Sequence, residues 1–221
     1  LAGMAVDGNH FFYVNPMEAV PEICDANPER SHIKTVRQEW YSCACCPPNI
    51  ARTITDIESL IYTVSGSRIF VHQYIGSRLE TEQEEGTVRL SLEADFPWSG
   101  KTKLRVNGPD TFCGEIALRI PEWCTRYTLA VNGENKRLED LDTERGYLIV
   151  KNIWKKGDCL EWNMEMEPRF VQADRRVFYN AGKAALIRGP LVYCIEEIDN
   201  GPYLYECRVD GACVPLEAWE E

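Results

Sequence analysis

Three cysteines lie close together in the segment WYSCACCPPNIAR, at positions 43, 45 and 46. Cys45 and Cys46 come directly before two prolines, and proline is tolerated in the first turn of a helix because its missing N–H has no helical partner there. A helix is therefore expected to begin at this point. The partial positive charge and unpaired N–H groups of a helix N-terminus favour a thiolate over a thiol. Cysteines in this position could supply a nucleophile or bind a thiophilic metal ion.

The residues alone leave other interpretations open. Cys-Ala-Cys-Cys is not a standard zinc-finger spacing, and a second ligand pair is missing nearby. A redox thiol protein using Cys45 and Cys46 is disfavoured because adjacent cysteines form a disulfide only with a strained ring. A cluster of buried structural cysteines is a further interpretation, since free cysteine behaves as a small hydrophobe.

The segment after the prolines, PNIARTITDIESLIYTV, predicts the helix that would position these cysteines. Its apolar residues recur at spacings of three and four, which is typical of an amphipathic helix with one buried face: Ile50, Ile54, Ile57, Ile61 and Val64. The following Ser65-Gly66-Ser67 is expected to end it.

From about residue 68 the pattern predicts β-strands instead. Segments rich in branched and aromatic residues alternate with turn signals: RIFVHQYI, TVRLSLEADF, KTKLRV, EIALRI, YTLAVNG, GYLIVK, CLEWNM and ALIRGPLVYCI. In one of them Val88, Leu90 and Leu92 alternate with polar residues, as a half-buried strand requires. Many short strands at regular spacing favour a mainly β fold containing a β-sandwich.

The composition limits which classes of partner the chain is expected to bind. The 221 residues carry a formal net charge of -11, and so acidic a surface repels phosphate backbones and anionic lipid. We therefore expect neither nucleic acid nor membrane as a partner, and no apolar run approaches the roughly 20 residues of a transmembrane helix. The ten cysteines are mostly spread through strand-like segments, which favours free thiols and a reducing, cytoplasmic location.

Two runs near the N-terminus, GMAVDGNHFFYVNPMEAV and WYSCACCPPNIAR, closely resemble the β-L-arabinofuranosidases of glycoside hydrolase family 127. Later segments resemble the β-sandwich of that family in the same order: RIPEWC, VNG, GYLIVKNIWKKGD, MEPRFVQAD and AALIRGPLVYCIEE. The resemblance extends from residue 1 to about residue 197. It implies that residues 1–65 are the C-terminal end of an (α/α)-barrel catalytic domain and that residues 66–221 are a β-sandwich domain.

The resemblance also implies roles for individual residues. Cys45 would be the catalytic nucleophile and a zinc ligand, Cys46 a second zinc ligand, and Tyr13 a contact of the sugar. The remaining zinc ligands and the acid/base glutamate lie upstream of residue 1 in the family. The chain begins Leu-Ala-Gly-Met and reads as a C-terminal portion that would be inactive alone. An arabinofuranoside-type carbohydrate is the implied substrate.

Two further expectations complete the analysis. The alternative to an enzyme portion is a non-catalytic carbohydrate-binding or structural β-sandwich module, with Trp98 or Trp123 as candidate contacts. If the barrel is absent, the apolar face of the helix should be exposed, and an exposed apolar patch favours self-association.

Overall fold

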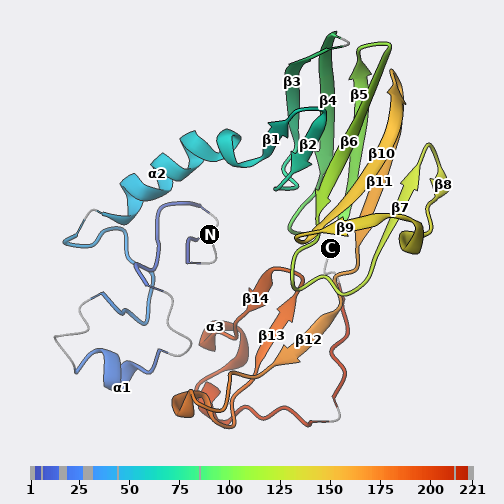
Figure 1. Cartoon of the computed structure of the whole chain (residues 1–221). Helices are drawn as coiled ribbons and strands as arrows, with labels where there is room; N and C mark the ends of the chain where they lie inside the picture. The colour runs from blue at the N-terminus through green and yellow to red at the C-terminus, as the bar shows by residue number, and fades with distance from the viewer. Residues whose placement is uncertain are drawn as a thin grey trace. The chain divides into compact units, whose positions relative to one another are not determined.

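The computed structural model describes residues 3–5, 7–14, 19–26, 32–43, 45–84, 86–211 and 213–218. The chain divides into two compact units, residues 1–59 and 60–221. It is mainly β, as predicted, with three sheets and few helices (Figure 1).

The first sheet has five strands in the order β1-β2-β6-β10-β9. Their bounds are β1 Tyr62–Ser65, β2 Arg68–Val71, β6 Thr111–Arg119, β9 Asp142–Glu144 and β10 Tyr147–Lys155. β6 and β10 pair antiparallel along their whole length, whereas β2 joins β6 in parallel. Long pairing between β6 and β10 gives this sheet a central ribbon of apolar side chains.

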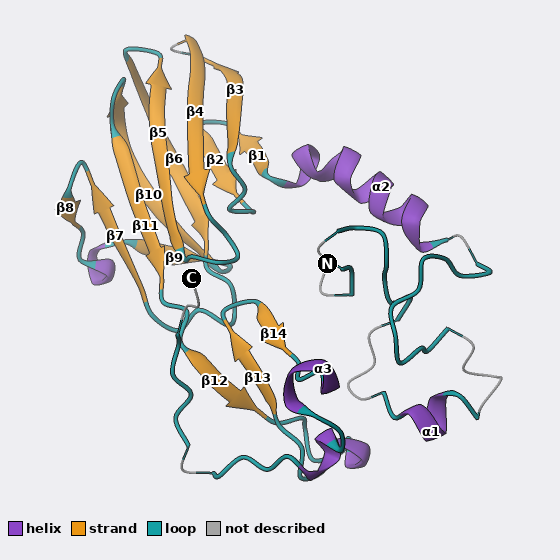
Figure 2. Ribbon diagram, turned by 180° about the vertical axis from the view of Figure 1, so that it is seen from behind, coloured by secondary structure: helices purple, strands orange, loops and turns teal. Residues whose placement is uncertain are grey.

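The second sheet has six strands in the order β3-β4-β5-β11-β7-β8 (Figure 2). Their bounds are β3 Ser77–Gln83, β4 Gly86–Ala94, β5 Lys101–Gly108, β7 Tyr127–Val131, β8 Glu134–Asn135 and β11 Cys159–Met164. The tight turn between β7 and β8 uses Asn132 and Gly133 with φ of 53° and 80°. Asn-Gly suits such a hairpin because both residues tolerate positive φ.

One buried hydrophobic cluster takes side chains from both large sheets. Val88, Leu90 and Leu92 of β4 all point into it, which confirms the alternation seen in the sequence. Trp154 of β10 is fully buried, and its indole N–H donates to the carbonyl of Gly114, 3.1 Å away. These strands therefore cover one another within residues 60–221, and burial of their apolar area supplies the stabilising free energy.

The third sheet is small and has the order β12-β13-β14. Its strands are β12 Pro168–Val171, β13 Ala185–Arg188 and β14 Leu191–Tyr193. Arg188 is buried and donates to the carbonyl of Trp98 at 2.9 Å, and it pairs with Glu217 at 2.7 Å. This arginine ties the small sheet to a loop of the second sheet and to the C-terminal segment.

The predicted strands are found, with three differences. Strand β3, SRLETEQ, has one apolar residue, Leu79, so no alternation of apolar residues marks it in the sequence. The sequence prediction did not include the short strands β8, β9 and β12, and ALIRGPLVYCI forms two strands separated by Gly189-Pro190.

The prediction of a helix up to Val64 is wrong. Helix α2 spans Cys46–Asp56 and continues as a 3-10 turn to Leu60, after which the chain forms β1. Tyr62, Thr63 and Val64 favour a strand, and β1 gains a hydrogen-bonded partner in β2.

The described residues before position 60 include the helices α1 Pro21–Cys24 and α2 Cys46–Asp56. No residue of α2 is buried, and Ile50, Ile54 and Ile57 are 42%, 63% and 36% exposed. The expected exposure of its apolar face is thus observed. Within the described ranges, no helix is long and apolar enough to cross a membrane. The assignment of residues 1–65 and 66–221 to a barrel end and a sandwich stays a prediction.

Candidate active site

The start of α2 positions the cysteine cluster. Cys45 is the N-cap residue, and prolines occupy the first turn, as the sequence predicted. The Cys45 carbonyl accepts hydrogen bonds from the backbone N–H of Asn49 at 3.3 Å and from the Asn49 side-chain amide at 2.9 Å. This pairing fixes the backbone that carries the Cys45 sulfur, while the sulfur itself stays exposed.

The sequence-predicted residues come together around the Tyr13 hydroxyl. Its oxygen lies 2.5 Å from the Cys45 Sγ and 3.4 Å from the Cys43 Sγ. The Cys43 and Cys45 sulfurs are 3.7 Å apart, and those of Cys45 and Cys46 are 4.0 Å apart. Segments separated by about thirty positions in the sequence therefore form one sulfur–phenol cluster.

Neighbouring rings hold Tyr13 in place. Its ring centroid lies 4.5 Å from that of His32 and 5.4 Å from that of Tyr41. Tyr41 is buried and donates to the carbonyl of Phe11 at 3.3 Å. Phe11 in turn bridges to Gln38 through paired backbone hydrogen bonds. Sequence reasoning did not identify Tyr41 as part of this support, because an aromatic residue beside the cysteines carries no distinctive signal.

The electrostatics of the cluster differ from the expectation for an isolated helix N-terminus. The hydroxyl of Tyr13 donates to Cys43, which lowers the pKa of the Cys43 thiol, and a backbone hydrogen bond involving Cys45 lowers it further. The same sulfur contacts, led by Cys43, raise the pKa of Tyr13. At Cys45 the Tyr13 hydroxyl lowers the pKa, but the neighbouring sulfurs of Cys43 and Cys46 and desolvation outweigh it, so the net pKa is raised. Negative charge is therefore favoured on Cys43 over Cys45.

Two of the sulfurs are spaced as zinc ligands would be. With Zn–S bonds near 2.3 Å and tetrahedral angles, two thiolates on one zinc lie about 3.8 Å apart. The observed 4.0 Å between Cys45 and Cys46 fits this spacing, and so does the 3.7 Å between Cys43 and Cys45. Across the described part of the chain, no group of three or more His, Cys, Asp or Glu residues is arranged to hold a metal ion. This chain can thus offer a pair of ligands, short of a closed site of four.

The two candidate tryptophans lie outside the cysteine cluster, and so does His72, whose ring contacts the Tyr147 hydroxyl at 2.7 Å and the Thr63 hydroxyl at 2.8 Å. Trp123 packs against the core and stacks on Phe96, whereas Trp98 is 55% exposed. A shallow hollow of about 520 Å³ on the six-stranded sheet contains none of the clustered cysteines and no Tyr13.

Comparison with known families identifies all three parts of the chain. Residues 1–59 match the β-L-arabinofuranosidase GH127 catalytic domain. Residues 68–166 match the β-L-arabinofuranosidase GH127 middle domain. Residues 168–221 match the glycoside hydrolase family 127 C-terminal domain. Tyr13 and the three clustered cysteines all lie in the catalytic-domain match.

Individual relatives agree with these matches. A non-reducing end β-L-arabinofuranosidase of Bifidobacterium longum subsp. longum is 38% identical over 220 residues, which is 96% of this chain and 32% of the relative. A crystal structure of a GH127 β-L-arabinofuranosidase from Geobacillus stearothermophilus T6 matches with a TM-score of 0.83 and 42% identity. That alignment covers 92% of this chain and 32% of the other. A GH127 β-arabinofuranosidase structure matches at a TM-score of 0.73, with 31% identity over 90% of this chain and 31% of the other.

The chain spans about a third of the length of the relatives it matches. Within that third the resemblance is continuous, since the three family matches follow one another from residue 1 to residue 221. The chain therefore belongs to glycoside hydrolase family 127.

Proposed function

We propose that this chain is the nucleophile-bearing, C-terminal portion of a retaining glycoside hydrolase that acts on β-L-arabinofuranosides. One observation carries the proposal: the Cys45 sulfur is exposed at the start of α2, in contact with Tyr13, within the segment that matches the GH127 catalytic domain. The substrate class follows from the printed names of the relatives, which are β-L-arabinofuranosidases.

In the proposed reaction, Cys45 takes the place of the carboxylate nucleophile used by most retaining glycosidases. Its thiolate attacks the anomeric carbon, the bond to the leaving oxygen breaks, and a general acid protonates that oxygen. Water then loses a proton to the conjugate base of that acid and attacks the anomeric carbon, the carbon–sulfur bond breaks, and the thiolate is regenerated with overall retention. The acid/base is proposed to be a glutamate outside these 221 residues.

Zinc is the proposed cofactor, held on this chain by Cys45 and Cys46. A zinc ion bound there would deprotonate its cysteine ligands at neutral pH. That property answers the raised pKa of the Cys45 thiol, which by itself disfavours the nucleophilic form. The 4.0 Å spacing of the two sulfurs is compatible with this pairing, but Cys43 lies at an equally suitable 3.7 Å from Cys45, so the choice of Cys46 rests on the family resemblance. Because a closed site takes four ligands, the chain alone should bind zinc weakly and should not hydrolyse glycosides.

Tyr13 is proposed to contact the sugar. Its ring lies beside the Cys45 sulfur, so a furanose whose anomeric carbon meets that sulfur would also reach the tyrosine. The surrounding fold is proposed to be the end of an (α/α) barrel over residues 1–65 and a β-sandwich over residues 66–221. A reducing, cytoplasmic location is proposed because several of the ten cysteines lie in strand-like segments of the sequence.

The alternative is a non-catalytic carbohydrate-binding or structural β-sandwich module. A sugar platform needs exposed aromatic faces, and of the two candidate tryptophans Trp98, 55% exposed, offers one. Trp123 is committed to packing. The match of residues 1–59 to a catalytic domain also favours the enzyme portion over this module.

Self-association is proposed for the chain by itself, through the exposed apolar face of α2. Ile50, Ile54, Ile57 and Leu60 are all at least one-third exposed, and an apolar patch of this kind favours association. Sedimentation over a range of concentrations tests the proposal. A monomer at every soluble concentration would contradict it.

The test of function is Cys45→Ser in the complete enzyme, assayed on an aryl β-L-arabinofuranoside. A hydroxyl is a far poorer nucleophile and zinc ligand than a thiolate, so turnover should fall by about 10² or more. Cys194→Ser, an exposed cysteine of the other unit, is the matched control and should keep full turnover. A Cys45→Ser enzyme with more than about a tenth of wild-type turnover would refute the nucleophile. Metal analysis of the same preparations should show zinc lost with Cys45.

A further inference from the structure

Cys43 has no part in the reaction proposed above, yet it is bound into the same cluster. Its sulfur accepts a hydrogen bond from the Tyr13 hydroxyl at 3.4 Å and lies 3.7 Å from the Cys45 Sγ. The Tyr13 oxygen lies 2.5 Å from the Cys45 Sγ on its other side. The hydroxyl therefore stands between two sulfurs that are two residues apart in the sequence.

A phenol hydroxyl carries one proton, so it can donate to only one of these sulfurs at a time. When it donates to Cys43, the Tyr13 oxygen can accept the S–H of the Cys45 thiol. The ring cannot swing away easily, because His32 and Tyr41 pack against it. The position of the hydroxyl beside Cys45 is thus set by Cys43 on one side and by the two rings on the other.

We propose that Cys43 is a positioning residue that fixes the Tyr13 hydroxyl and, through it, the direction of the Cys45 sulfur. The backbone of Cys45 is already held by Asn49, which leaves rotation of the side chain as the remaining freedom. A nucleophile that is misdirected by a small displacement loses much of its rate, because the reacting atoms must meet in near-attack geometry. This role rests on the proposed function of Cys45 as the nucleophile.

The activity test compares Cys43→Ala with Cys43→Ser in the complete enzyme. Cys43→Ala removes the acceptor, and kcat should fall by about ten- to a hundredfold while KM changes by less than about twofold. Cys43→Ser keeps an acceptor for the Tyr13 hydroxyl and should recover most of kcat. Cys213→Ala, at an exposed cysteine of the other unit, should change neither constant. Equal loss in the alanine and serine variants, or a rise in KM alone, would overturn the proposal.

A second experiment uses the 221-residue chain and needs no activity. Alkylation of Cys45 by iodoacetamide is followed by tandem mass spectrometry over a range of pH in the wild type, Cys43→Ala, Tyr13→Phe and the double variant, and the plateau rates of the thiolate form are compared, because both changes also shift the pKa of Cys45. Each single change frees the Cys45 sulfur from one hydrogen-bonded arrangement, so alkylation should quicken by about two- to tenfold. The double variant should match the single variants, since both changes break the same link.

The activity test and the alkylation test distinguish a failure of the proposed role of Cys43 from a failure of the proposed function. Independent, multiplying effects of Cys43→Ala and Tyr13→Phe would refute the link, as would alkylation rates that equal the wild-type rate. Circular dichroism checks that each variant keeps its fold, and Cys43→Val, which also lacks an acceptor for the Tyr13 hydroxyl, serves in place of Cys43→Ala if the latter does not. An inactive wild-type enzyme would refute the proposed function, whereas the alkylation cycle would still report whether Cys43 positions Cys45 through Tyr13.

Discussion

The two units of the chain obtain their stability in different ways. Residues 60–221 bury the facing side chains of two sheets in one cluster that includes Trp154, Trp162 and Phe112. Among the described residues before position 60, the buried hydrophobic side chains are Cys24 and Tyr41. Yet the exposed cysteines beside Tyr13 lie in residues 1–59, the unit with few buried side chains. The proposed catalytic residues therefore lie in residues 1–59, the unit that depends most on packing partners. None of them lies in residues 60–221, the well-packed unit.

This difference has a physical cause. A sheet presents a whole face to a second sheet, so strands can bury their apolar side chains within one chain. A single helix gains most of its stability from tertiary packing of its apolar face. The apolar face of α2 has no buried residue, and its hydrogen bonds, including Thr53 to the carbonyl of Asn49 at 2.9 Å, are local.

Amide hydrogen exchange should show the largest contrast. Amides of β6, β10 and β11 should exchange only on global unfolding, whereas those of α2 should open at much lower free energy. We expect protection factors to differ by at least about a hundredfold. Exchange of the dilute, monomeric chain measured by mass spectrometry checks this. Equal, strong protection of both units would remove the distinction between them.

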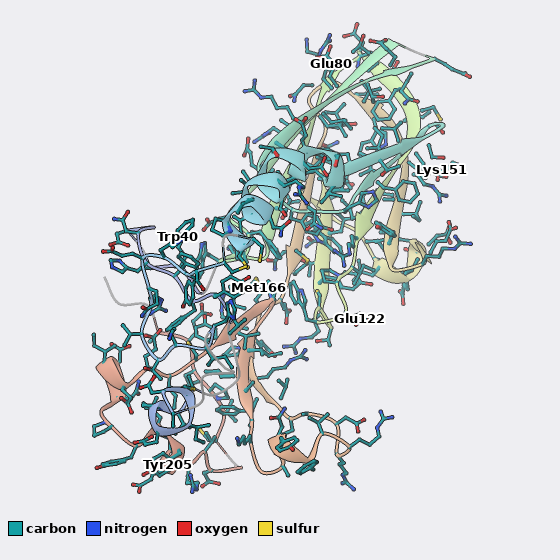
Figure 3. All side chains as sticks on the ribbon, turned by 90° about the vertical axis from the view of Figure 1, so that its left-hand side faces the viewer. Trp40, Glu80, Glu122, Lys151, Met166 and Tyr205 are labelled. Atoms are coloured by element: carbon teal, nitrogen blue, oxygen red, sulfur yellow. The ribbon has the colours of Figure 1, made fainter. Side chains whose placement is uncertain are left out.

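A pair of tryptophan substitutions sharpens the contrast within one residue type. Trp154 is fully buried and donates to Gly114, whereas Trp40, labelled in Figure 3, is 63% exposed. Trp154→Ala should lower the free energy of unfolding by about 3–5 kcal/mol. Trp40→Ala should change it by less than about 0.5 kcal/mol. Urea denaturation measures both, and a comparable loss in the two variants would contradict the unequal burial.

A polar substitution on α2 tests whether the exposed apolar face of this helix mediates self-association. Ile54 is 63% exposed, so Ile54→Gln should change the free energy of unfolding by less than about 0.5 kcal/mol. The same change should weaken self-association, because it removes apolar area from the exposed face. Sedimentation compares it with Thr55→Gln, at an exposed polar position of the same helix. Unchanged association in Ile54→Gln would exclude this face as the contact.

The smallest expected effect is a pH dependence in the well-packed unit. Desolvation of the His72 ring, with the charge of Arg119, holds its pKa below the ordinary value. The unfolded chain therefore takes up a proton below about pH 6.5, before the folded chain does, and stability contributed by neutral His72 is lost as pH falls through that range. Between about pH 7 and about pH 5, the urea midpoint of unfolding should decrease less in His72→Gln than in the wild type. An identical decrease in both would contradict this origin.

The sequence by itself determined much of this protein. Alternation of Val88, Leu90 and Leu92 specified the buried face of β4, since side chains of a strand point to opposite faces in turn. The prolines after Cys46 specified where α2 begins, because proline suits only the first turn. The motifs around Tyr13 and Cys45 were also sufficient to identify the family, which the matches to all three parts of the chain then established.

Only the tertiary structure decided where α2 ends and how the cysteines differ. The apolar spacing from Ile50 to Val64 suits a helix throughout, but Tyr62–Ser65 pairs with the next strand, β2, across the tight turn at residues 66–67, and helical spacing does not reveal such a hairpin. Likewise, the helix N-terminus predicts a thiolate at Cys45. The contacts of Tyr13 with Cys43 and Cys45 depend on a fold that joins distant segments, and they favour charge on Cys43 instead. Local pattern fixes which residues can do chemistry, whereas their pKa values follow from neighbours that only folding brings within hydrogen-bonding distance.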